Sequence, residues 1–594
     1  MEMNVERTTT GSSGGRPLVM GSRGVISAGH YLAAEAGQAM FRRGGNAVDA
    51  AAAAGFALTV LLPNQNGLLG EAPTLVHSAR QGKVWAVSGH GTAPRAASIE
   101  AMRRLGLEIM PGDGLLPAVV PSAVATWIEL LRRFGRLRLA EVLGPAIELA
   151  DGGFPVFEGL HRQIAANADR FRKDWPSSAE AYLPGGRPPG IGELWRQPDL
   201  ARTLRALGRA DARRRGRAAG LRAAHEEFYR GSIARRIVAF CKSSAVPDST
   251  GSSHTGLLSL EDFAAYTARL EEPASAVYRG LRVYKCPPWT QGPAMLQTLK
   301  LLEGFDLPAM GLNSADYVHT VVECMKLAYA DREFYYGDPD FARVPLRRLL
   351  SGAYAQRRRA LIDPAAASME LRPGDMPAIA AESILDVERA AGSAAAAGAG
   401  DTTSVQAADA EGNIISAVCS GGWLASSPVV PGLGCPLGTR GQMFCLTPGH
   451  PNALEPGKRP RTTLTPSLAA RSRRPPHLAF GCPGGDCQDQ WGLQFLLNLV
   501  EFGMSLQEAV EAPTFWTAHW PESFYPRTAQ PGSLYLESRL AAPVRDELAS
   551  RGHRVQVRPA WAGGNTMAVA RDQAGGALHA AASPRYEPAY AIGW

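Results

Sequence analysis

The sequence predicts a protein that mixes helices and strands around large buried cores, and two observations lead to this class. Of its 594 residues, 45% are hydrophobic, which is ample for extensive burial. Both the helical period and the strand-like alternation of apolar residues recur along the chain. Length alone would suggest several domains, although large single units also reach this size. No stretch holds the roughly 20 apolar residues of a membrane-spanning helix, so we expect a soluble protein.

The predicted elements follow from these periods and from turn residues. Strands are expected at 24–27, 74–78, 83–88 and 278–284. Two helices separated by Gly44-Gly45-Asn46 are expected between the first strand and a turn at 63–67. Further helices are expected at 122–133, 139–149 and, as a long amphipathic helix, 313–334.

Charge and cysteine usage exclude some classes of function. The net charge of +7 is small for this length, so a pI near 9 does not indicate a nucleic-acid partner. The basic run at 213–217 is interpreted as a solvated helix face, with an anionic partner as the alternative. The eight cysteines lack the paired spacing of a zinc site, which predicts free thiols, no metal and no cofactor.

The N-terminal region, residues 1–17, is polar and rich in Thr, Ser and Gly. No apolar run follows a basic start, so the features of a secretory signal peptide are missing. We therefore expect a cytoplasmic protein without a membrane partner.

Residues 364–401 change character and precede the most informative local feature. The segment is rich in Ala, Gly and Pro, which is typical of a flexible tail. Directly after it, residues 402–418 predict a strand, a tight turn at Glu411-Gly412-Asn413 and a second strand. The tail thus leads straight into a hairpin strand that begins with Thr402.

A threonine at such a junction can act as a nucleophile if it becomes the first residue of a chain. Its own α-amine, with a reference pKa of about 7.7–8.0, can then remove the hydroxyl proton. The same hydroxyl can expose that amine by attacking the carbonyl of Asp401, after which the ester is hydrolysed. From local sequence alone two alternatives stay open: Thr402 is an ordinary strand residue, or Thr403 is the nucleophile.

A second segment offers groups that stabilise an oxyanion. Gly484 and Gly485 follow an apolar stretch, and consecutive glycines present backbone N–H groups unobstructed by side chains. A tight structural turn is the plain alternative, and a phosphate loop is disfavoured because its lysine is absent. The hydroxyl-rich stretch 457–466, which includes Thr462 and Thr463, could line a polar pocket or satisfy turns by capping.

Together these segments resemble the γ-glutamyltransferase family from about residue 24 to the end of the chain. Four motifs occur in the family's order: Gly45-Asn46-Ala47-Val48-Asp49-Ala50-Ala51, Asp331-Arg332-Glu333-Phe334-Tyr335-Tyr336-Gly337-Asp338-Pro339, Pro448-Gly449-His450-Pro451-Asn452 with Pro456-Gly457-Lys458-Arg459-Pro460, and Gly484-Gly485-Asp486 with 493–503. The last two are the most specific. No single motif suffices, but four in order leave little room for chance.

The resemblance implies an α+β fold, a four-layer αββα sandwich of the N-terminal-nucleophile hydrolase type. It implies self-cleavage between Asp401 and Thr402 into residues 1–401 and 402–594. These pieces would stay together as a heterodimer, or as a dimer of heterodimers. The family nucleophile lies eleven residues before the Asn of a turn, and Asn413 therefore selects Thr402 over Thr403.

The resemblance also implies roles for other residues. Ser420 matches the hydroxyl that supports the nucleophile, and Gly484 and Gly485 match the oxyanion glycines. Thr462 and Thr463 match a serine pair that holds the substrate α-carboxylate.

The residues that would recognise a glutamyl group depart from the family pattern. His90 or Thr92 stands where an arginine precedes Ala-Pro, Met443 stands before Phe444 where an aspartate holds the amine, and Arg440 lies near a family glutamine. Each lost charge-assisted hydrogen bond is worth about 1.5–3 kcal/mol, so two lower affinity by orders of magnitude. We expect γ-glutamyl peptides to be poor substrates, and assign His90 and Arg440 to binding a different small molecule.

The sequence leaves four functions open. The first is hydrolysis or transfer of a non-glutamyl amide or acyl group in specialised metabolism. The second is a carbon–carbon hydrolase that makes an alkylproline unit of an antibiotic of the lincosamide, hormaomycin or pyrrolobenzodiazepine type, because some relatives in such pathways resemble enzymes of that kind. The third is a genuine γ-glutamyl hydrolase or transpeptidase. The fourth is a non-catalytic scaffold, which the intact Thr402, Ser420 and glycine pair disfavour.

Overall fold

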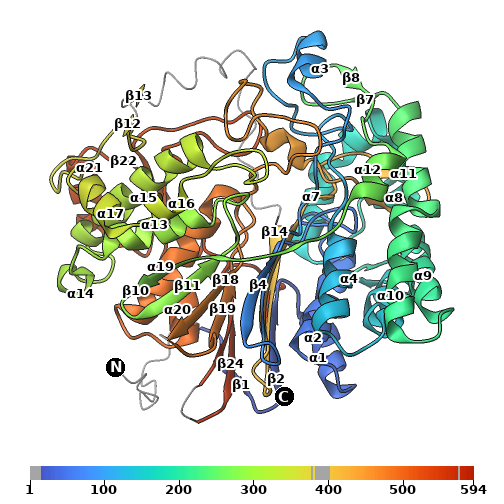
Figure 1. The fold of residues 1–594 in the computed structure, drawn as a ribbon, viewed down its shortest axis with the longest axis horizontal. Helices are drawn as coiled ribbons and strands as arrows, with labels where there is room; N and C mark the ends of the chain where they lie inside the picture. The colour runs from blue at the N-terminus through green and yellow to red at the C-terminus, as the bar shows by residue number, and fades with distance from the viewer. Residues whose placement is uncertain (1–14, 376–378, 381–401, 472, 573–574) are drawn as a thin grey trace.

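Two seven-stranded antiparallel sheets face each other at the centre of the computed structural model, and helices cover the outer face of each sheet (Figure 1). The structure describes residues 15–375, 379–380, 402–471, 473–572 and 575–594. The layers run helix, sheet, sheet, helix, so the predicted α+β four-layer sandwich is confirmed. None of the described helices is long and apolar enough to cross a lipid bilayer.

The first sheet holds the predicted hairpin at its centre. Its strands run in the order β25 (Tyr590–Gly593), β2 (Gly24–Ala28), β14 (Thr402–Asp409), β15 (Ile414–Ser420), β3 (Thr74–Ser78), β4 (Lys83–Val87) and β9 (Leu270–Glu271). Every residue of β14 and β15 is buried, as expected for central strands covered on both faces.

The second sheet also combines strands that lie far apart in the sequence. Its strands run in the order β1 (Val19–Gly21), β24 (Leu578–Ala582), β23 (Met567–Arg571), β19 (Leu478–Gly481), β18 (Ser467–Arg471), β11 (Leu281–Lys285) and β10 (Ala274–Tyr278).

Helices α1 (Tyr31–Arg42) and α2 (Ala47–Leu61) cover the first sheet, and α13 (Pro293–Leu302), α19 (Gln488–Val500) and α20 (Leu506–Glu511) cover the second. The other helices are α3 (Ile99–Arg104), α4 (Ala123–Phe134), α5 (Leu139–Val142), α6 (Gly144–Gly152), α7 (Glu158–Lys173), α8 (Pro176–Tyr182), α9 (Pro198–Ala212), α10 (Arg217–Tyr229), α11 (Ser232–Ser243), α12 (Leu260–Ala265), α14 (Leu307–Met310), α15 (Ala315–Tyr335), α16 (Leu346–Leu349), α17 (Gly352–Arg359) and α21 (Ala542–Ser550).

Small strands and single 3₁₀ turns complete the described elements. The strands are β5 (Phe154–Pro155), β6 (Leu194–Trp195), β7 (Val246–Pro247), β8 (Ser253–His254), β12 (Glu370–Leu371), β13 (Ile379–Ala380), β16 (Val429–Val430), β17 (Cys435–Pro436), β20 (Phe515–Trp516), β21 (Ser533–Glu537) and β22 (Arg554–Arg558). The 3₁₀ turns are η1 (Pro184–Gly186), η2 (Arg440–Met443) and η3 (Gly485–Cys487).

Three apolar cores lie between the four layers. Val25, Leu75, Ala479 and Val569 belong to the core between the sheets. A second core joins α1 and α2 to the first sheet, and a third joins α13, α15 and α19 to the second sheet. The hairpin therefore sits between two packed layers, which hold its residues in a fixed place.

A capping box fixes the start of α2 and ties it to the hairpin. The Asn46 side chain accepts the N–H of Asp49 at 3.2 Å, while the Asp49 carboxylate accepts the N–H of Asn46 at 2.9 Å. The Asp409 carboxylate, at the end of β14, accepts the N–H of Ala47 at 2.9 Å. These bonds explain why the predicted Gly-Asn-Ala motif lies beside the strand that starts at Thr402.

Four predicted elements differ in the structure. The strand expected at 278–284 is interrupted after Tyr278 and continues as β11 from Leu281, because Arg279 and Gly280 both adopt positive φ and reverse the chain between β10 and β11. The helix expected at 139–149 is split into α5 and α6, where Pro145 removes a backbone donor. Arg213 to Arg215 lie exposed between α9 and α10 and are not a helix face.

The fourth difference concerns α15, predicted to be amphipathic but buried on nearly all sides. Of residues 315–333, all but Asp316 are buried. Residues 364–375, which the sequence assigned to the flexible tail, help to cover this helix. Lys326 donates to the Ser368 carbonyl at 3.0 Å, and the Gly374 N–H donates to Asp331 at 2.8 Å.

Candidate active site

The hairpin places two hydroxyl groups side by side at the start of β14. Thr402 pairs directly with Ser420 in the antiparallel register of β14 and β15. The Thr402 Oγ1 hydroxyl donates to Ser420 Oγ at 3.3 Å, and both residues are buried. Asp401, the other side of the expected cleavage site, lies outside the described residues.

Thr403 faces the opposite side of the sheet. Its Oγ1 packs so closely against Gly29 that a Cβ atom built on that glycine would lie 1.9 Å away. In the part of the chain that the structure describes, this hydroxyl has no hydrogen-bond partner, and Leu62 at the end of α2 is nearby. Because side chains alternate along a strand, only one of the two threonines can face Ser420.

Arg440 extends the polar row that begins at Thr402. Its Nη2 donates to Ser420 Oγ at 2.9 Å, and its Nε donates to Glu71 Oε2 at 2.7 Å. Arg440 and Glu71 are both fully buried, so the ion pair is shielded from water. The guanidinium is therefore two hydrogen bonds away from the Thr402 hydroxyl.

Glu71 is a site residue that sequence reasoning missed. Its backbone forms a bridge with Ser420, with N–H to carbonyl distances of 2.8 and 3.1 Å. Burial raises the pKa of Glu71, and the Arg440 cation opposes that shift. The available signal was a single acid in the otherwise uncharged stretch 68–73.

Gly484 and Gly485 follow β19 with φ angles of 125° and 53°, in the region that favours glycine. A Cβ atom on Gly484 would lie 2.3 Å from the Trp491 ring. Within the described part of the chain, neither glycine N–H donates a hydrogen bond. Two free backbone donors at a turn are the groups that an oxyanion hole requires.

Two aromatic side chains join the glycine pair to Arg440. Phe524 lies 3.2 Å from the position of a Cβ on Gly485, and its ring centre is 5.4 Å from the Arg440 guanidinium carbon. Trp423 packs edge-on against Phe524 and lies 5.7 Å from the same carbon. Neither aromatic residue was predicted, because nothing in the local sequence marks it.

Three predicted site residues lie outside the hydrogen-bonded row that starts at Thr402: Thr462, Thr463 and His90. Gln291 links Thr462 to the glycine pair, since its N–H donates to the Thr462 carbonyl and its side chain donates to the Gly485 carbonyl. Thr463 Oγ1 is buried without a hydrogen-bond partner. No hydrogen bond joins these three residues to Thr402, Ser420 or Arg440 within the described chain.

His90 stacks on the Trp289 ring at 4.6 Å, and the Trp289 carbonyl accepts the N–H of Thr462. Burial, together with the neighbouring Arg459 cation, holds the pKa of His90 well below its usual range. A neutral imidazole cannot replace the arginine that family members place ahead of Ala-Pro. His90 therefore packs against Trp289 in its neutral form, and its assignment to substrate binding stays a prediction.

One group of described residues has metal-ligand character, far along α15 from the hairpin. His319, Glu323 and His553 bring three ligand atoms within 4.8 Å of one another. Lys326 donates to Glu323 at 2.6 Å and Arg372 donates to it at 3.1 Å, so cations already occupy this carboxylate. The donor set fits an internal hydrogen-bond network better than a divalent metal.

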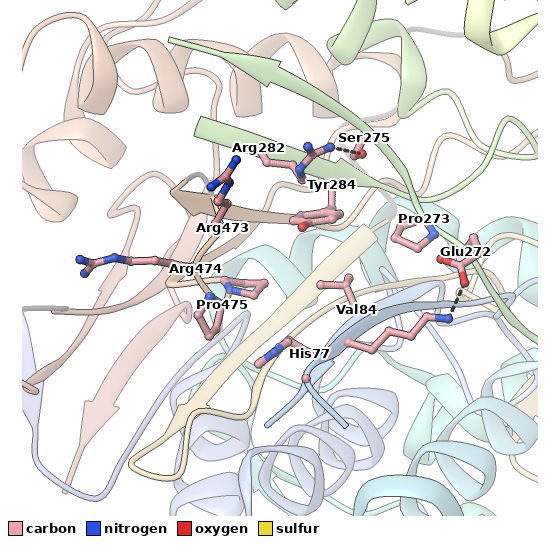
Figure 2. Close-up of a pocket in the computed structure, with 13 residues that line it drawn as sticks. His77, Val84, Glu272, Pro273, Ser275, Arg282, Tyr284, Arg473, Arg474 and Pro475 are labelled. Carbon is pink, nitrogen blue, oxygen red and sulfur yellow. Dashed lines mark hydrogen bonds and ion pairs between the residues drawn. The ribbon is translucent and has the colours of Figure 1, made fainter. Parts of the chain in front are cut away.

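A groove of about 500 Å³ opens at the other end of the sheets (Figure 2). It lies between β3–β4 and β10–β11, and Arg282, Arg473 and Arg474 line one side. His77 on its wall pairs with Ile414, which is six residues along β15 from Ser420 or about 20 Å. This groove is separate from the hydroxyl row.

The gamma-glutamyltranspeptidase family model matches residues 33–593. The chain belongs to this family. Membership agrees with the order of motifs along the sequence and with the four-layer fold, and it makes the protein an N-terminal-nucleophile hydrolase.

Relatives within the family include acylases as well as glutathione hydrolases. The Acylase ACY 1 proenzyme of Pseudomonas sp. (strain SE83) is 35% identical over 92% of this chain and 89% of its own length. A solved threonine-to-alanine variant of LmbA2991 is 43% identical, with a TM-score of 0.92 over 98% of this chain and 99% of its own. The cephalosporin acylase of Bacillus halodurans is 32% identical, with a TM-score of 0.83 over 98% and 97%.

Proposed function

We propose that the chain cleaves itself between Asp401 and Thr402 and then uses Thr402 to hydrolyse or transfer a non-glutamyl acyl group. The observation that carries this proposal is the buried row of Thr402, Ser420 and Arg440 at the start of β14. A buried hydroxyl that donates to a second hydroxyl, itself held by a cation, is arranged for nucleophilic attack.

The proposed reaction has two steps, acylation of Thr402 and hydrolysis of the resulting ester. The freed α-amine of Thr402 takes the hydroxyl proton while Oγ1 attacks the acyl carbonyl, and the Gly484 and Gly485 N–H groups stabilise the oxyanion. The C–N bond then breaks, and the ammonium returns its proton to the leaving amine. Water, activated by the same amine, cleaves the ester and regenerates the hydroxyl.

The surroundings of Arg440 support a substrate other than a γ-glutamyl group. Met443 takes the place of the family aspartate that holds an amine, and His90 is neutral and packed against Trp289. Arg440 instead offers a cation next to Ser420, where an anionic group of the substrate would lie close to the scissile carbonyl.

Arg440 also favours a second candidate, hydrolysis of a carbon–carbon bond. Thr402 would attack a ketone carbonyl, and the bonding electrons would leave on a carbanion stabilised as an enolate, which the Thr402 ammonium then protonates. A buried cation beside the nucleophile stabilises such a developing anion. This is the alkylproline-type reaction that the sequence raised as an alternative.

The two pieces, 1–401 and 402–594, would remain a heterodimer after cleavage. The first sheet supports this, because β2 before the cut lies between β25 and β14 after it. Separating the pieces would require breaking both of these strand pairs.

A Thr402→Ala chain should stay full length on a denaturing gel, whereas the natural chain and Thr403→Ala should each split into two. Mass spectrometry of the smaller piece should give a first residue of Thr402. A natural chain that never splits would contradict self-processing and leave the scaffold function standing.

The substrate class is tested with a chromogenic γ-glutamyl anilide and with matched acyl anilides. We expect the glutamyl compound to be turned over at least a hundredfold more slowly than by a dedicated glutamyltransferase. Comparable rates would establish a genuine γ-glutamyl enzyme. Release of a ketone-derived acid with no amide turnover would favour the carbon–carbon reaction.

A further inference from the structure

The ion pair between Glu71 and Arg440 leaves polar atoms unused on both residues. Glu71 Oε2 accepts from Arg440 Nε, but Glu71 Oε1 is buried and has no hydrogen-bond partner among the described residues. On the guanidinium, Nε and Nη2 are bound, while Nη1 meets only the Met443 sulfur at 3.9 Å. One carboxylate oxygen therefore has no partner among the described residues, and one charged donor group has only a weak sulfur acceptor, next to Ser420.

Such atoms are unusual in a folded protein. More than nine in ten buried polar groups find a partner, because leaving one unpaired is costly. The Glu71 oxygen and the Arg440 Nη1 group belong to one ion pair whose charges cancel, so a ligand with a single charged group would not satisfy both. A ligand with an N–H donor beside a carboxylate would satisfy both at once.

We propose that Glu71 and Arg440 together recognise an amino-acid-like group of the substrate, with its amine N–H on Glu71 Oε1 and its carboxylate on Arg440 Nη1. Glu71 would thus determine specificity. Its carboxylate, in the segment between α2 and β3, would bind the amine in place of the aspartate that other family members use. The inference rests on the proposed function only in taking Thr402 as the reacting group.

The position of the pair sets the length of the substrate. Ser420 Oγ lies 3.3 Å from Thr402 Oγ1 and 2.9 Å from Arg440 Nη2, so the guanidinium that would bind the substrate lies two hydrogen bonds from Thr402 Oγ1. The backbone bridge between Glu71 and Ser420 keeps the carboxylate at the same short range. This short connection is the reason to test an acyl group whose spacer is one carbon shorter than in a γ-glutamyl group.

The charges are also compatible with this arrangement. The Arg440 guanidinium, the Glu71 carboxylate, the substrate ammonium and the substrate carboxylate would form a closed ring of four groups. Their charges would alternate in sign around this ring. An apolar wall excludes water from it, because Trp423 and Phe524 lie over Arg440. In such surroundings each charge-assisted bond contributes more than it does in water.

The test uses three small amides that differ by one group: L-asparagine, succinamic acid, which lacks the amine, and β-alaninamide, which lacks the carboxylate. Isothermal titration with the processed natural protein should show L-asparagine binding at least about tenfold more tightly than either analogue. Equal binding of L-asparagine and succinamic acid, or no binding of L-asparagine at millimolar concentration, overturns the proposal.

A variant separates recognition from support of the fold. Glu71→Gln should weaken L-asparagine about tenfold while leaving succinamic acid unchanged, so that the difference between the two ligands disappears. Equal weakening of both ligands means that Glu71 only positions Arg440, and contradicts recognition of the amine. If this variant does not fold, the comparison of ligands on the natural chain still decides.

Binding does not need the nucleophile to react, so the two proposals fail separately. L-asparagine that binds through Glu71 to a chain without hydrolase activity would refute the proposed function alone. Hydrolysis by Thr402 with no preference for an amine would refute the role of Glu71 alone.

Discussion

At the scale of single residues, Ser420 connects the Thr402 hydroxyl to the charge of Arg440. Its hydroxyl is contacted from both sides, at 3.3 Å and 2.9 Å. The Ser420 hydroxyl is thus placed to orient the Thr402 hydroxyl and to hold the Arg440 guanidinium next to it.

Ser420→Ala should slow acylation about tenfold, the cost of one hydrogen bond at a reacting group. Single-turnover kinetics with an acyl anilide would measure this. Ser416→Ala is the matched control, because Ser416 lies on the same strand and donates only to the Phe480 carbonyl at 2.9 Å. The control should lose stability without losing rate; equal rate losses would contradict a role for Ser420 in orientation.

Arg440→Gln should destabilise the fold by about 3–5 kcal/mol, because Glu71 is left as a buried unpaired charge. The double variant Glu71→Leu with Arg440→Met removes both charges and should recover most of that stability. It should not recover hydrolysis. Chemical denaturation and initial rates, compared across the set, would show whether the pair serves the reaction or only the fold.

The sequence assigned Thr402, Ser420 and Arg440 to one site, and the structure places them in one hydrogen-bonded row. The first two follow from motif order and from the spacing to Asn413, which are local properties. Glu71 could not be predicted in the same way. It reaches Ser420 through a bridge between segments almost 350 residues apart in the chain, which no local pattern encodes. His90 was assigned to substrate binding from its place beside Ala-Pro, but tertiary packing places it against Trp289.

At the scale of elements, the turn between β19 and α19 presents the two free glycine N–H groups. Its shape depends on φ angles of 125° and 53° that other residues adopt only with strain. The turn also packs against Trp491 and Phe524, so its position is fixed from two sides.

Gly484→Ala should lower hydrolysis by about a hundredfold, the effect of displacing one oxyanion donor. The added methyl would meet the Trp491 ring at 2.3 Å and force the turn to move. Gly503→Ala is the control: its φ is 63°, but nothing lies within 4 Å of the new methyl. Steady-state rates that fall equally in both variants would mean that backbone strain alone explains the loss.

Element boundaries were predicted well where a period or a cap dominates, as in α2, β3 and β14. They were wrong at the chain reversal formed by Arg279 and Gly280, which both adopt positive φ. Arg279 adopts φ of 46° to close the β10–β11 turn, although arginine carries no turn signal. The burial of α15 was not predictable either, because residues 364–375 cover it from a segment whose composition is typical of a flexible tail.

At the scale of the whole molecule, charged groups join segments on both sides of the proposed cut. Glu333 on α15 forms ion pairs with Arg332 at 2.6 Å and with Arg461 at 2.9 Å. Burial alone would raise the pKa of Glu333, but the Arg461, Arg332 and Arg527 cations lower it to about 2.

This shift predicts the acid stability of the protein. The folded state favours ionised Glu333, so its contribution is complete above the ordinary pKa near 4.5 and is lost as the pH falls toward 2. The loss should be about 3 kcal/mol across that window. Glu333→Gln should be less stable at pH 7 and show a flatter pH dependence between pH 4.5 and 2. Unchanged slopes in urea titrations would contradict the assignment.

Both sheets are assembled from alternating parts of the chain. In the second sheet β1 and the β11–β10 pair come before residue 402, and the four strands between them come after it. Residues 402–594 expressed alone should therefore remain unfolded or aggregate, as circular dichroism and sedimentation would show. A stable, monomeric 402–594 fragment would be incompatible with this interleaving.

The C-terminal carbonyl of Trp594 accepts N–H groups from Ser22 and Arg23 at 2.8 and 2.7 Å, so the last residue of one piece is fastened to the first strands of the other. Before cleavage, folding is unimolecular and independent of concentration. After cleavage, an unfolded molecule would have to find its other half by diffusion, in competition with aggregation of exposed strands. The cleaved protein would thus refold poorly once unfolded, and the lifetime of the enzyme would be set by its rate of unfolding.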